Sequence, residues 1–258
     1  MTFDYDYFVT EIFKLTSIDL HAYKQNQMKR RIDALIAKHK IEDYDHYIYA
    51  LRTDKELLDE FVDYITINVS EFYRNPEQWE LIKTTVIPGL LKDFGKSQLK
   101  IWSAACSTGD EPYSLVMALS EFLPLDSIHI IATDINEQVI EKANIGLYSE
   151  KSISNVPIHL KNRFFIQNGS FYQISEDVKQ CVTFKQHNLL KDAYISNCNL
   201  IVCRNVLIYF TEETKDIIFE KLFHSLTDRG ILFIGSTEQI LKYREIGYKR
   251  LDSFFYKK

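Results

Sequence analysis

Residues 99–115 read LKIWSAACSTGDEPYSL, and this stretch predicts the fold of the chain. A short apolar strand ends in a turn of very small residues, from Ser103 to Gly109. Pro112 then stands where a helix begins, because proline suits the first helical turn. Apolar residues at helical spacing give that helix one buried face: Leu115, Ala118, Leu119 and Phe122. Strand, small-residue turn and helix together let a nucleotide-like ligand approach the backbone at the carboxyl edge of a parallel sheet.

Two carboxylates at the end of this turn indicate the charge of the ligand. A phosphate-binding loop is usually rich in glycine, whereas Asp110 and Glu111 stand where a phosphate would lie. Carboxylates repel phosphate and attract a cation, which argues against ATP or NAD. The pattern favours a positively charged nucleoside, and S-adenosylmethionine (SAM), with its sulfonium and amino group, is the predicted cofactor.

A third acid supports this prediction. Asp134 ends the apolar run 129–133 and lies 25 residues after Gly109. An acid about 20 residues beyond the turn holds the ribose hydroxyls in Rossmann-like folds. The alternative is that Asp134 only caps a helix or forms a turn. In combination with the small-residue turn, its position favours ribose binding.

The composition excludes several classes of protein. The 258 residues are 46% hydrophobic and 14% aromatic, which is enough for a real core and argues against disorder. The net charge of −5 argues against nonspecific nucleic-acid binding, although a local basic patch is compatible with it. No signal peptide or long apolar span is present, so we expect a cytoplasmic protein without membrane insertion. The cysteines have neither CxxC pairs nor metal-ligand spacing, which predicts buried reduced thiols and no metal site: Cys106, Cys181, Cys198 and Cys203.

The periodicity of the chain changes near residue 99. Before it, the sequence predicts helices over 3–15, 22–39, 44–51, 55–67 and 76–83. After it, β-rich runs at 100–103, 128–133, 182–186, 200–203, 231–235 and 248–256 alternate with helical stretches. This alternation predicts an α/β fold with a mostly parallel sheet covered by helices on both faces. We therefore expect a helical domain at 1–70, a linker at 71–98 and a catalytic domain at 99–258.

Two local patterns refine the second domain. The last helix has Thr211 as its N-cap and Gly230 as its terminator. The weakly patterned segment 146–181 predicts a small β-subdomain. It contains a hairpin around Asn168 and Gly169, because Asn-Gly favours a tight type I′ turn.

Five stretches, in order along nearly the whole chain, carry a family resemblance: 68–74 (NVSEFYR), 102–114 (WSAACSTGDEPYS), 132–135 (ATDI), 187–190 (HNLL) and 203–210 (CRNVLIYF). Together they resemble the CheR-type chemotaxis receptor glutamate O-methyltransferases. The resemblance implies a small N-terminal helical domain followed by a Rossmann-like SAM-dependent methyltransferase domain with a small β-subdomain. It also implies methylation of glutamates on the cytoplasmic helical bundle of methyl-accepting chemoreceptors, with S-adenosyl-L-homocysteine (SAH) as product.

The same resemblance assigns expected roles to single residues. The expected cofactor contacts are Asn68, Ser70 and Arg74 closing over SAM, Glu111 near its amino-acid end, Asp134 at the ribose, Asn188 and Leu189 beside adenine, and Arg204 and Asn205 by the methyl group. Arg74 is also a candidate clamp for the substrate carboxylate, the alternative being a salt bridge to Glu71 or Glu77. Tyr209 either borders the methyl channel or forms a wall of the core.

Glutamate methylation needs little acid–base help, because the glutamate side chain, with a pKa of about 4.3, is already ionised at neutral pH. We therefore expect no catalytic histidine, and His187, beside Asn188, has a structural role in this interpretation.

The predicted helix 22–39 carries a row of cations. Lys24, Arg31 and Lys38 recur every seventh residue along the edge of an apolar stripe. Such a row is often only a solvated face. The resemblance implies that it docks the acidic helices of the receptor, whose charges it complements, and Arg31 is the residue expected to matter most there.

Two other functions remain open at this point: the same fold acting on a nucleic acid or a small molecule, and a non-catalytic SAM-sensing module. The acidic balance disfavours RNA, and a small-molecule substrate would leave the basic helix unexplained. The intact acids and the Arg204–Asn205 pair argue against a non-catalytic module.

Overall fold

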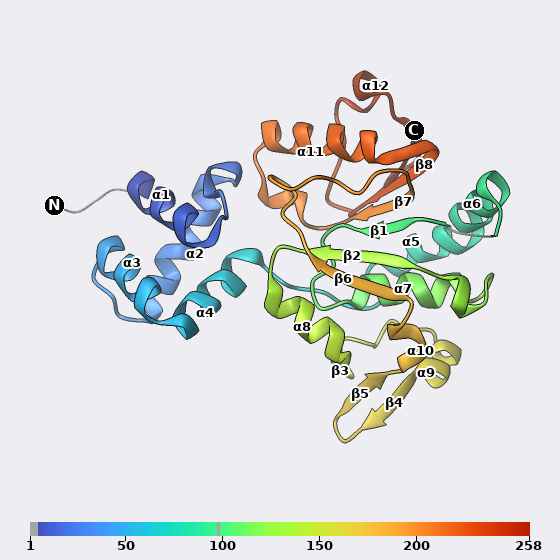
Figure 1. The fold of residues 1–258 in the computed structure, drawn as a ribbon, viewed down its shortest axis with the longest axis horizontal. Helices are drawn as coiled ribbons and strands as arrows, with labels where there is room; N and C mark the ends of the chain where they lie inside the picture. The colour runs from blue at the N-terminus through green and yellow to red at the C-terminus, as the bar shows by residue number, and fades with distance from the viewer. Residues whose placement is uncertain (1–4, 97–98) are drawn as a thin grey trace. The chain divides into compact units, whose positions relative to one another are not determined.

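A computed structural model describes residues 5–96 and 99–258. The chain divides into two compact units (Figure 1). The helical unit comprises residues up to 68 together with 208–215, and the α/β unit comprises 69–207 and 216–258. The predicted boundary at residue 70 is therefore close to the observed one, but segment 208–215 belongs to the helical unit.

The helical unit contains α1 (Tyr5–Thr16), the 3-10 turn η1 (Leu20–Ala22), α2 (Gln25–Lys38), α3 (Tyr44–Thr53) and α4 (Lys55–Thr66). All four predicted helices are present, and the expected start at residue 3 lies outside the described residues. The aspartates Asp43 and Asp54 cap α3 and α4 by accepting hydrogen bonds from backbone N–H groups of the first turn. The predicted apolar stripe of α2 is buried: Met28, Ile32, Leu35 and Ile36.

Segment 208–215 pairs with the chain just before α2. The backbone N–H of Lys24 donates to the carbonyl of Tyr209 (2.9 Å), and that of Thr211 donates to the carbonyl of Ala22 (2.9 Å). The rings of Tyr23 and Phe210 lie 4.6 Å apart between their centroids. These contacts bring Tyr209 to the N-terminal end of α2.

The α/β unit is built on a seven-stranded sheet in the order β6-β2-β1-β7-β8-β10-β9. Its strands are β1 (Ile101–Ser103), β2 (Ile130–Asp134), β6 (Val182–Gln186), β7 (Cys198–Cys203), β8 (Leu226–Ile234), β9 (Lys249–Asp252) and β10 (Phe255–Lys257). The first five pair in parallel, and β10 is antiparallel to β8 and β9. Figure 1 shows α7 (Asp110–Leu119) and α8 (Glu137–Ile145) on one side of the sheet and α11 (Glu212–Ser225) on the other. The mostly parallel α/β prediction is confirmed, and parallel strands end at a common edge.

The helix predicted over 76–83 is present, and it continues to Phe94, where the sequence had predicted a linker. Segment 76–94 is helical throughout, as α5 (Pro76–Leu81), the π-helical turn η2 (Ile82–Val86) and α6 (Ile87–Phe94). Pro88 does not end this helix, because the wide turn before it accommodates a residue that lacks an N–H group. The continuation was not predicted, because Pro88 and Gly89 suggested a helix end. In the structure, the neighbouring apolar residues Ile87 and Leu90 are buried in the core, which favours a helix through this point.

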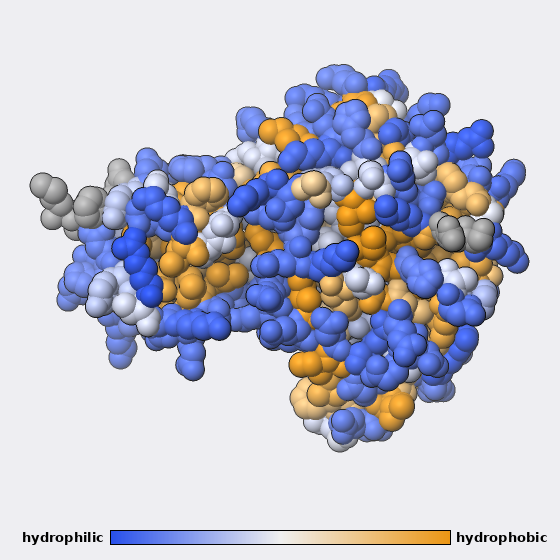
Figure 2. All heavy atoms as spheres, viewed as in Figure 1, coloured by the Kyte–Doolittle hydropathy of each residue, from blue (hydrophilic) through white to orange (hydrophobic). Residues whose placement is uncertain are grey.

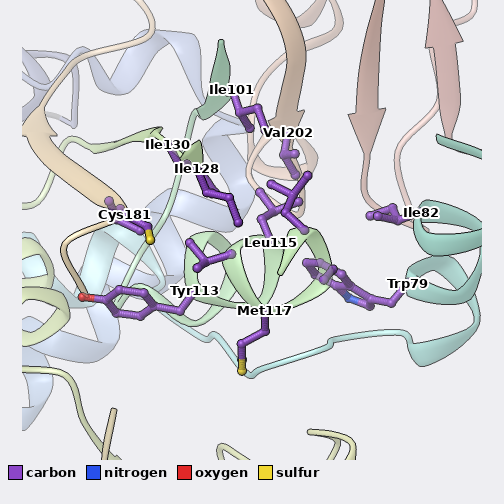
Figure 3. Close-up of a cluster of buried hydrophobic side chains, with 14 of the residues drawn as sticks. Trp79, Ile82, Ile101, Tyr113, Leu115, Met117, Ile128, Ile130, Cys181 and Val202 are labelled. Carbon is purple, nitrogen blue, oxygen red and sulfur yellow. The ribbon is translucent and has the colours of Figure 1, made fainter. Parts of the chain in front are cut away.

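The main core of the α/β unit surrounds α7. Figure 3 shows Leu115 and Met117 of this helix among residues of the sheet and of the 76–94 helix, including Trp79, Ile82, Ile101, Ile130 and Val202. Nine of the ten residues of α7, from Asp110 to Leu119, are buried. The helix is therefore fixed on all sides, and so is the turn that precedes it.

Segment 146–181 forms the predicted β-subdomain, a three-stranded antiparallel sheet in the order β3-β5-β4. Its strands are β3 (Leu147–Ser149), β4 (Phe165–Asn168) and β5 (Phe171–Ile174), flanked by α9 (Ile158–Phe164) and α10 (Glu176–Lys179). Asn168 pairs with Phe171, so the two loop residues are Gly169 and Ser170. Only Gly169 has a positive φ (62°), which fits a type II′ turn and corrects the predicted type I′ turn.

One face of this small sheet is exposed and apolar. Leu147, Ile166 and Phe171 are 40%, 68% and 46% exposed. Figure 2 shows hydrophobic residues gathered over the β3–β5 region.

Among the helices of residues 5–96 and 99–258, none combines the length and apolar character needed to cross a lipid bilayer.

The last predicted helix begins where expected but ends earlier. Thr211 caps α11 by accepting a hydrogen bond at Oγ1 from the N–H of Thr214 (3.3 Å). The helix ends at Ser225, and Gly230 lies within β8 rather than at a helix terminus. A Cβ on Gly230 would lie 2.9 Å from the carbonyl oxygen of Cys198. Glycine is needed there for close strand approach, which the sequence pattern does not distinguish from helix termination. Three short elements complete the described residues: η3 (Leu125–Ser127), η4 (Leu207–Tyr209) and α12 (Tyr243–Ile246).

Candidate functional site

The turn after β1 lies over the ends of the two neighbouring strands. The N–H of Ala104 donates to the carbonyl of Val202 on β7 (2.8 Å), and that of Cys106 donates to the carbonyl of Thr133 on β2 (2.9 Å). Gly109 has a φ of 88°, and a Cβ there would lie 2.9 Å from the Cβ of Ala143. The small-residue turn is therefore held close against the carboxyl edge of the sheet.

Asp134 ends β2 beneath this turn and is 8% exposed. Its Oδ2 accepts a hydrogen bond from the N–H of Ser107 (2.8 Å), and its Oδ1 accepts one from the N–H of Asn136 (3.1 Å). The N-cap of α8 is Asn136, so helix capping does not account for Asp134. The turn-forming role is present, and ribose binding stays a prediction. Burial raises the pKa of the Asp134 carboxyl, and the backbone N–H groups oppose that shift.

Glu111 lies in the first turn of α7, and its carboxylate faces two polar partners. Ser103 Oγ donates to its Oε1 (2.8 Å), and its Oε2 lies 3.6 Å from Arg204 Nη1. Burial raises the pKa of the Glu111 carboxyl, and the nearby Arg204 opposes this shift. Glu111 is thus a mostly buried acid with only a loose ion pair.

Asp110 does not face a ligand in the way its sequence position suggested. Its carboxylate accepts hydrogen bonds from the hydroxyls of Thr108 (2.5 Å) and Ser152 (2.5 Å), and Ser70 is a further hydroxyl partner. Burial raises the pKa of the Asp110 carboxyl, and these hydroxyls lower it. Asp110 therefore links the end of the small-residue turn 103–109 to segment 69–75 and to the β-subdomain.

Arg204 follows β7, and its guanidinium makes its hydrogen bonds within the α/β unit. Its Nη2 donates to the carbonyl of Arg74 (2.9 Å), to Asn75 Oδ1 (3.1 Å) and to Gln78 Oε1 (2.8 Å). These contacts fix the segment that carries Arg74 and hold the guanidinium beside Glu111. Contact of Arg204 with a methyl group stays a prediction.

The residues of 68–75 fall in different units. Asn68 belongs to the helical unit, where its Nδ2 donates to Asp63 Oδ1 (2.9 Å). Arg74 is half-buried in the α/β unit, and its Nη1 donates to the carbonyl of Val69 (3.2 Å). No carboxylate of the described residues forms an ion pair with Arg74, so the salt bridge to Glu71 or Glu77 is not formed.

The end of β6 carries the residues expected beside adenine. Asn188 Oδ1 accepts a hydrogen bond from the N–H of Leu190 (2.9 Å), and the carbonyl of Leu189 accepts one from the Tyr194 hydroxyl (2.7 Å). His187 packs edge-on against the ring of Trp102, with centroids 5.4 Å apart. The His187 side chain thus has a structural environment, as predicted.

Sequence reasoning missed Glu238, which lies after β8 and is 6% exposed. Its carboxylate accepts hydrogen bonds from the N–H groups of Asn205 and Gly235, among others. The only signal in the sequence is an acid shortly after a glycine at the end of a predicted strand. That signal also fits an ordinary surface loop.

The cationic row of α2 is only partly available to a partner. Lys38 Nζ pairs with Glu60 Oε1 (2.5 Å). Arg31 donates to the carbonyl of Tyr64, and its guanidinium lies 4.4 Å from the centroid of that ring. Both side chains therefore contact α4, so Arg31 and Lys38 of the predicted docking row are engaged within the helical unit. Sequence spacing could not show this, because it contains no information on α4.

Arg30, which lies outside the predicted row, is exposed and makes no ion pair or hydrogen bond within the described chain. It lines a cavity of about 380 Å³ formed entirely by the helical unit. The lining residues are Tyr23, Lys24, Gln27, Met28, Arg30, Arg31, Tyr64, Ile67 and Tyr209. The cavity thus combines three cations with three tyrosines.

Within residues 5–96 and 99–258, no three or more His, Cys, Asp or Glu side chains are grouped so that they could hold a metal ion. All four cysteines are buried and unbridged, which confirms the prediction of free thiols.

The chemistry of the carboxyl edge fits SAM. Asp134 is a buried acid at the end of β2, and Glu111 is a mostly buried acid in the first turn of α7. Arg204, the buried cation beside Glu111, donates its hydrogen bonds to neutral acceptors. A cationic nucleoside suits such a site, and a nucleotide phosphate does not. The parallel sheet, the small-residue turn and these acids define a SAM-dependent methyltransferase.

Comparison with known proteins identifies the family. Residues 68–251 match the SAM-binding domain of CheR methyltransferases, and residues 4–66 match their all-alpha domain. A chemotaxis protein methyltransferase of Listeria innocua is 41% identical over 253 residues, covering 98% of this chain and 96% of its own. Chemotaxis protein methyltransferase 1 of Pseudomonas aeruginosa is 32% identical and covers 92% of this chain and 90% of its own. The chain belongs to the CheR methyltransferase family, and its cofactor is SAM.

Proposed function

We propose that this chain transfers a methyl group from SAM to glutamate side chains on the cytoplasmic helices of chemoreceptors. The products are glutamyl methyl esters and SAH, and the reaction takes place in the cytoplasm. The observation that carries the choice of an acidic protein substrate is the cation-lined cavity of the helical unit, which contains Lys24, Arg30 and Arg31. Cations presented in this way complement a helix that displays glutamates.

Most of the proposed cofactor contacts belong to the α/β unit, and Asn68 belongs to the helical unit. In this proposal Glu111 binds the amino-acid end of SAM, Asp134 accepts hydrogen bonds from the ribose, and Asn188 with Leu189 flanks adenine. The remaining proposed contacts are Asn68, Ser70, Arg74, Arg204 and Asn205. When bound, SAM supplies an already activated methyl group on its sulfonium.

The remaining task of the protein is orientation. The glutamate carboxylate is ionised at neutral pH, so no general base is needed. Arg74 has a half-buried guanidinium with one hydrogen bond, to Val69, and its other donors suit a bidentate carboxylate. Tyr209 lines the cavity and is the second proposed catalytic residue. In-line positioning and water exclusion contribute up to about 7–11 kcal/mol in favourable cases.

A radiolabelled methyl-transfer assay tests the proposal. Purified protein is incubated with methyl-labelled SAM and, in separate reactions, with a chemoreceptor cytoplasmic fragment, total RNA or a small-molecule extract. We expect label in the receptor fragment only, released as methanol by mild base, because a methyl ester is base-labile. Label in RNA or in the extract would support the same fold with another substrate. Binding of SAM without transfer to any of them would support a non-catalytic module.

A further inference from the structure

Glu238 holds a second turn at the carboxyl edge of the sheet. Its Oε1 accepts hydrogen bonds from the backbone N–H groups of Val206 (3.1 Å) and Leu207 (2.8 Å). Its Oε2 accepts hydrogen bonds from the N–H groups of Asn205 (2.9 Å) and Gly235 (2.7 Å). Four backbone donors therefore converge on one buried carboxylate, and all of them belong to the α/β unit.

The shape of this turn depends on the carboxylate. Asn205 has a φ of 59°, in the left-handed region that residues other than glycine seldom adopt. Successive N–H groups that point to one side form an anion-binding nest, and here Glu238 fills that nest. Without an anion, three adjacent buried N–H groups would lose their acceptor, which favours a different backbone conformation.

Only a carboxylate satisfies all four donors. Glutamine has the same shape, but its amide group would place N–H donors against two of these backbone N–H groups. The side chain is also closely packed, since a Cβ on Gly235 would lie 2.7 Å from Glu238 Oε2 and 2.8 Å from the Asn205 nitrogen. The same contact can therefore be broken from two independent positions.

The turn lies in the middle of the proposed site. The turn comes directly after β7 and Arg204, and it contains Asn205. The neighbouring strand β1 leads into the small-residue turn 103–109. The turn that Glu238 holds also begins the segment that continues to Tyr209. The electrostatic influence of Glu238 reaches both Glu111 and Arg204.

We propose that Glu238 is a positioning residue for methyl transfer, which holds the 204–207 turn, and with it Asn205 and the start of the segment to Tyr209, in the reactive geometry. This inference rests on the proposed function. Glu238 acts through the turn and does not itself touch the substrate or the cofactor.

The test compares steady-state methylation of a receptor fragment by the parent, Glu238→Gln, Gly235→Ala and the control Glu245→Gln. Glu245 is an exposed residue of α12 in the same unit. We expect both turn variants to lose about 10- to 100-fold in kcat, because misplacement by about 1 Å can cost about 100-fold. The KM for the receptor should stay within about threefold, since the cations of α2 are unchanged, and Glu245→Gln should match the parent.

Circular dichroism and thermal unfolding establish how much of each variant is folded. An unchanged kcat in either folded turn variant overturns the proposal, as does a loss of kcat that only follows the folded fraction. If Glu238→Gln does not fold, Gly235→Ala must show the same loss of kcat. If neither folds, Glu238 is a folding element and the positioning role is wrong. An inactive parent and control would instead overturn the proposed function, and with it this inference.

Discussion

The carboxyl edge of the sheet and the basic face of α2 both present charge, but they hold it in different ways. At the edge, Asp134 is buried and Glu111 is mostly buried, and each carboxylate accepts hydrogen bonds from donors of the α/β unit. On α2, Arg30 is exposed and makes no ion pair or hydrogen bond with the described part of the chain. Fixed, buried charge suits a small ligand of one shape, whereas exposed charge steers a large partner and tolerates variation in its approach.

The largest effect is expected at the buried edge. Asp134→Ala should weaken SAH binding by about 10- to 150-fold, because a hydrogen bond to a charged group contributes about 1.5–3 kcal/mol. It should also lower the melting temperature, since the N–H groups of Ser107 and Asn136 lose their acceptor. Titration calorimetry and thermal unfolding measure the two effects. Asp126→Ala, outside the site, is the control, and equal SAH affinity in Asp134→Ala would exclude the ribose assignment.

Charge reversal at Arg30 on α2 should weaken the reaction with the receptor and leave cofactor binding unchanged. Arg30→Glu should lower kcat/KM for the receptor fragment by about 10-fold or more, because like charges at an interface cost up to several kcal/mol. Raised salt should slow the parent as well, since salt screens exposed charges. Arg31→Glu is the matched comparison. It should lower the stability by about 0.5–1 kcal/mol, the typical contribution of an exposed cation–π contact such as that with Tyr64. Normal receptor kinetics in Arg30→Glu would place the docking surface elsewhere.

A smaller effect is expected from Glu111→Gln, which keeps the shape of the side chain and removes its charge. We expect about a 10-fold loss of affinity for the cofactor, in the range for one charged hydrogen bond. SAM and SAH should lose affinity equally, because both carry the amino group that Glu111 is proposed to bind. A loss confined to SAM would indicate that Glu111 faces the sulfonium. Unchanged affinity for both would leave Glu111 with a helix-start role only.

The smallest effect is expected at the end of the cationic row. Lys38 pairs with Glu60, and the Lys38 side chain is 65% exposed. An exposed pair contributes about 0–1 kcal/mol, so Lys38→Ala should change the stability little. Receptor methylation should stay within about twofold of the parent, since this cation is already neutralised. A loss as large as that of Arg30→Glu would restore Lys38 to the docking surface.

The sequence predicted the fold well where one element carries its own pattern. The strand, turn and helix of 99–115 and the buried stripe of α2 follow from local periodicity and small residues. The predictions were wrong where contacts with a second element determine the local structure or the partners of a side chain. Pro88 stays inside a helix because the core requires its neighbours, and Arg31 is bound by Tyr64 of α4.

The same limit applies to the site. Asp134 and Glu111 could be proposed as site residues because each has a fixed position relative to the small-residue turn. Glu238 could not, because three of its four partners lie 31–33 residues earlier in the chain, and all four are backbone N–H groups, which leave no trace in side-chain identity.

The affinity for SAH, measured by calorimetry on Asp134→Ala and Arg30→Glu side by side, tests the division between the two regions most directly. The buried edge is proposed to bind the cofactor and the exposed cation only the receptor. Arg30→Glu should therefore bind SAH as tightly as the parent, while Asp134→Ala loses about 10-fold or more. Equal losses in the two variants, or a loss confined to Arg30→Glu, would contradict this account.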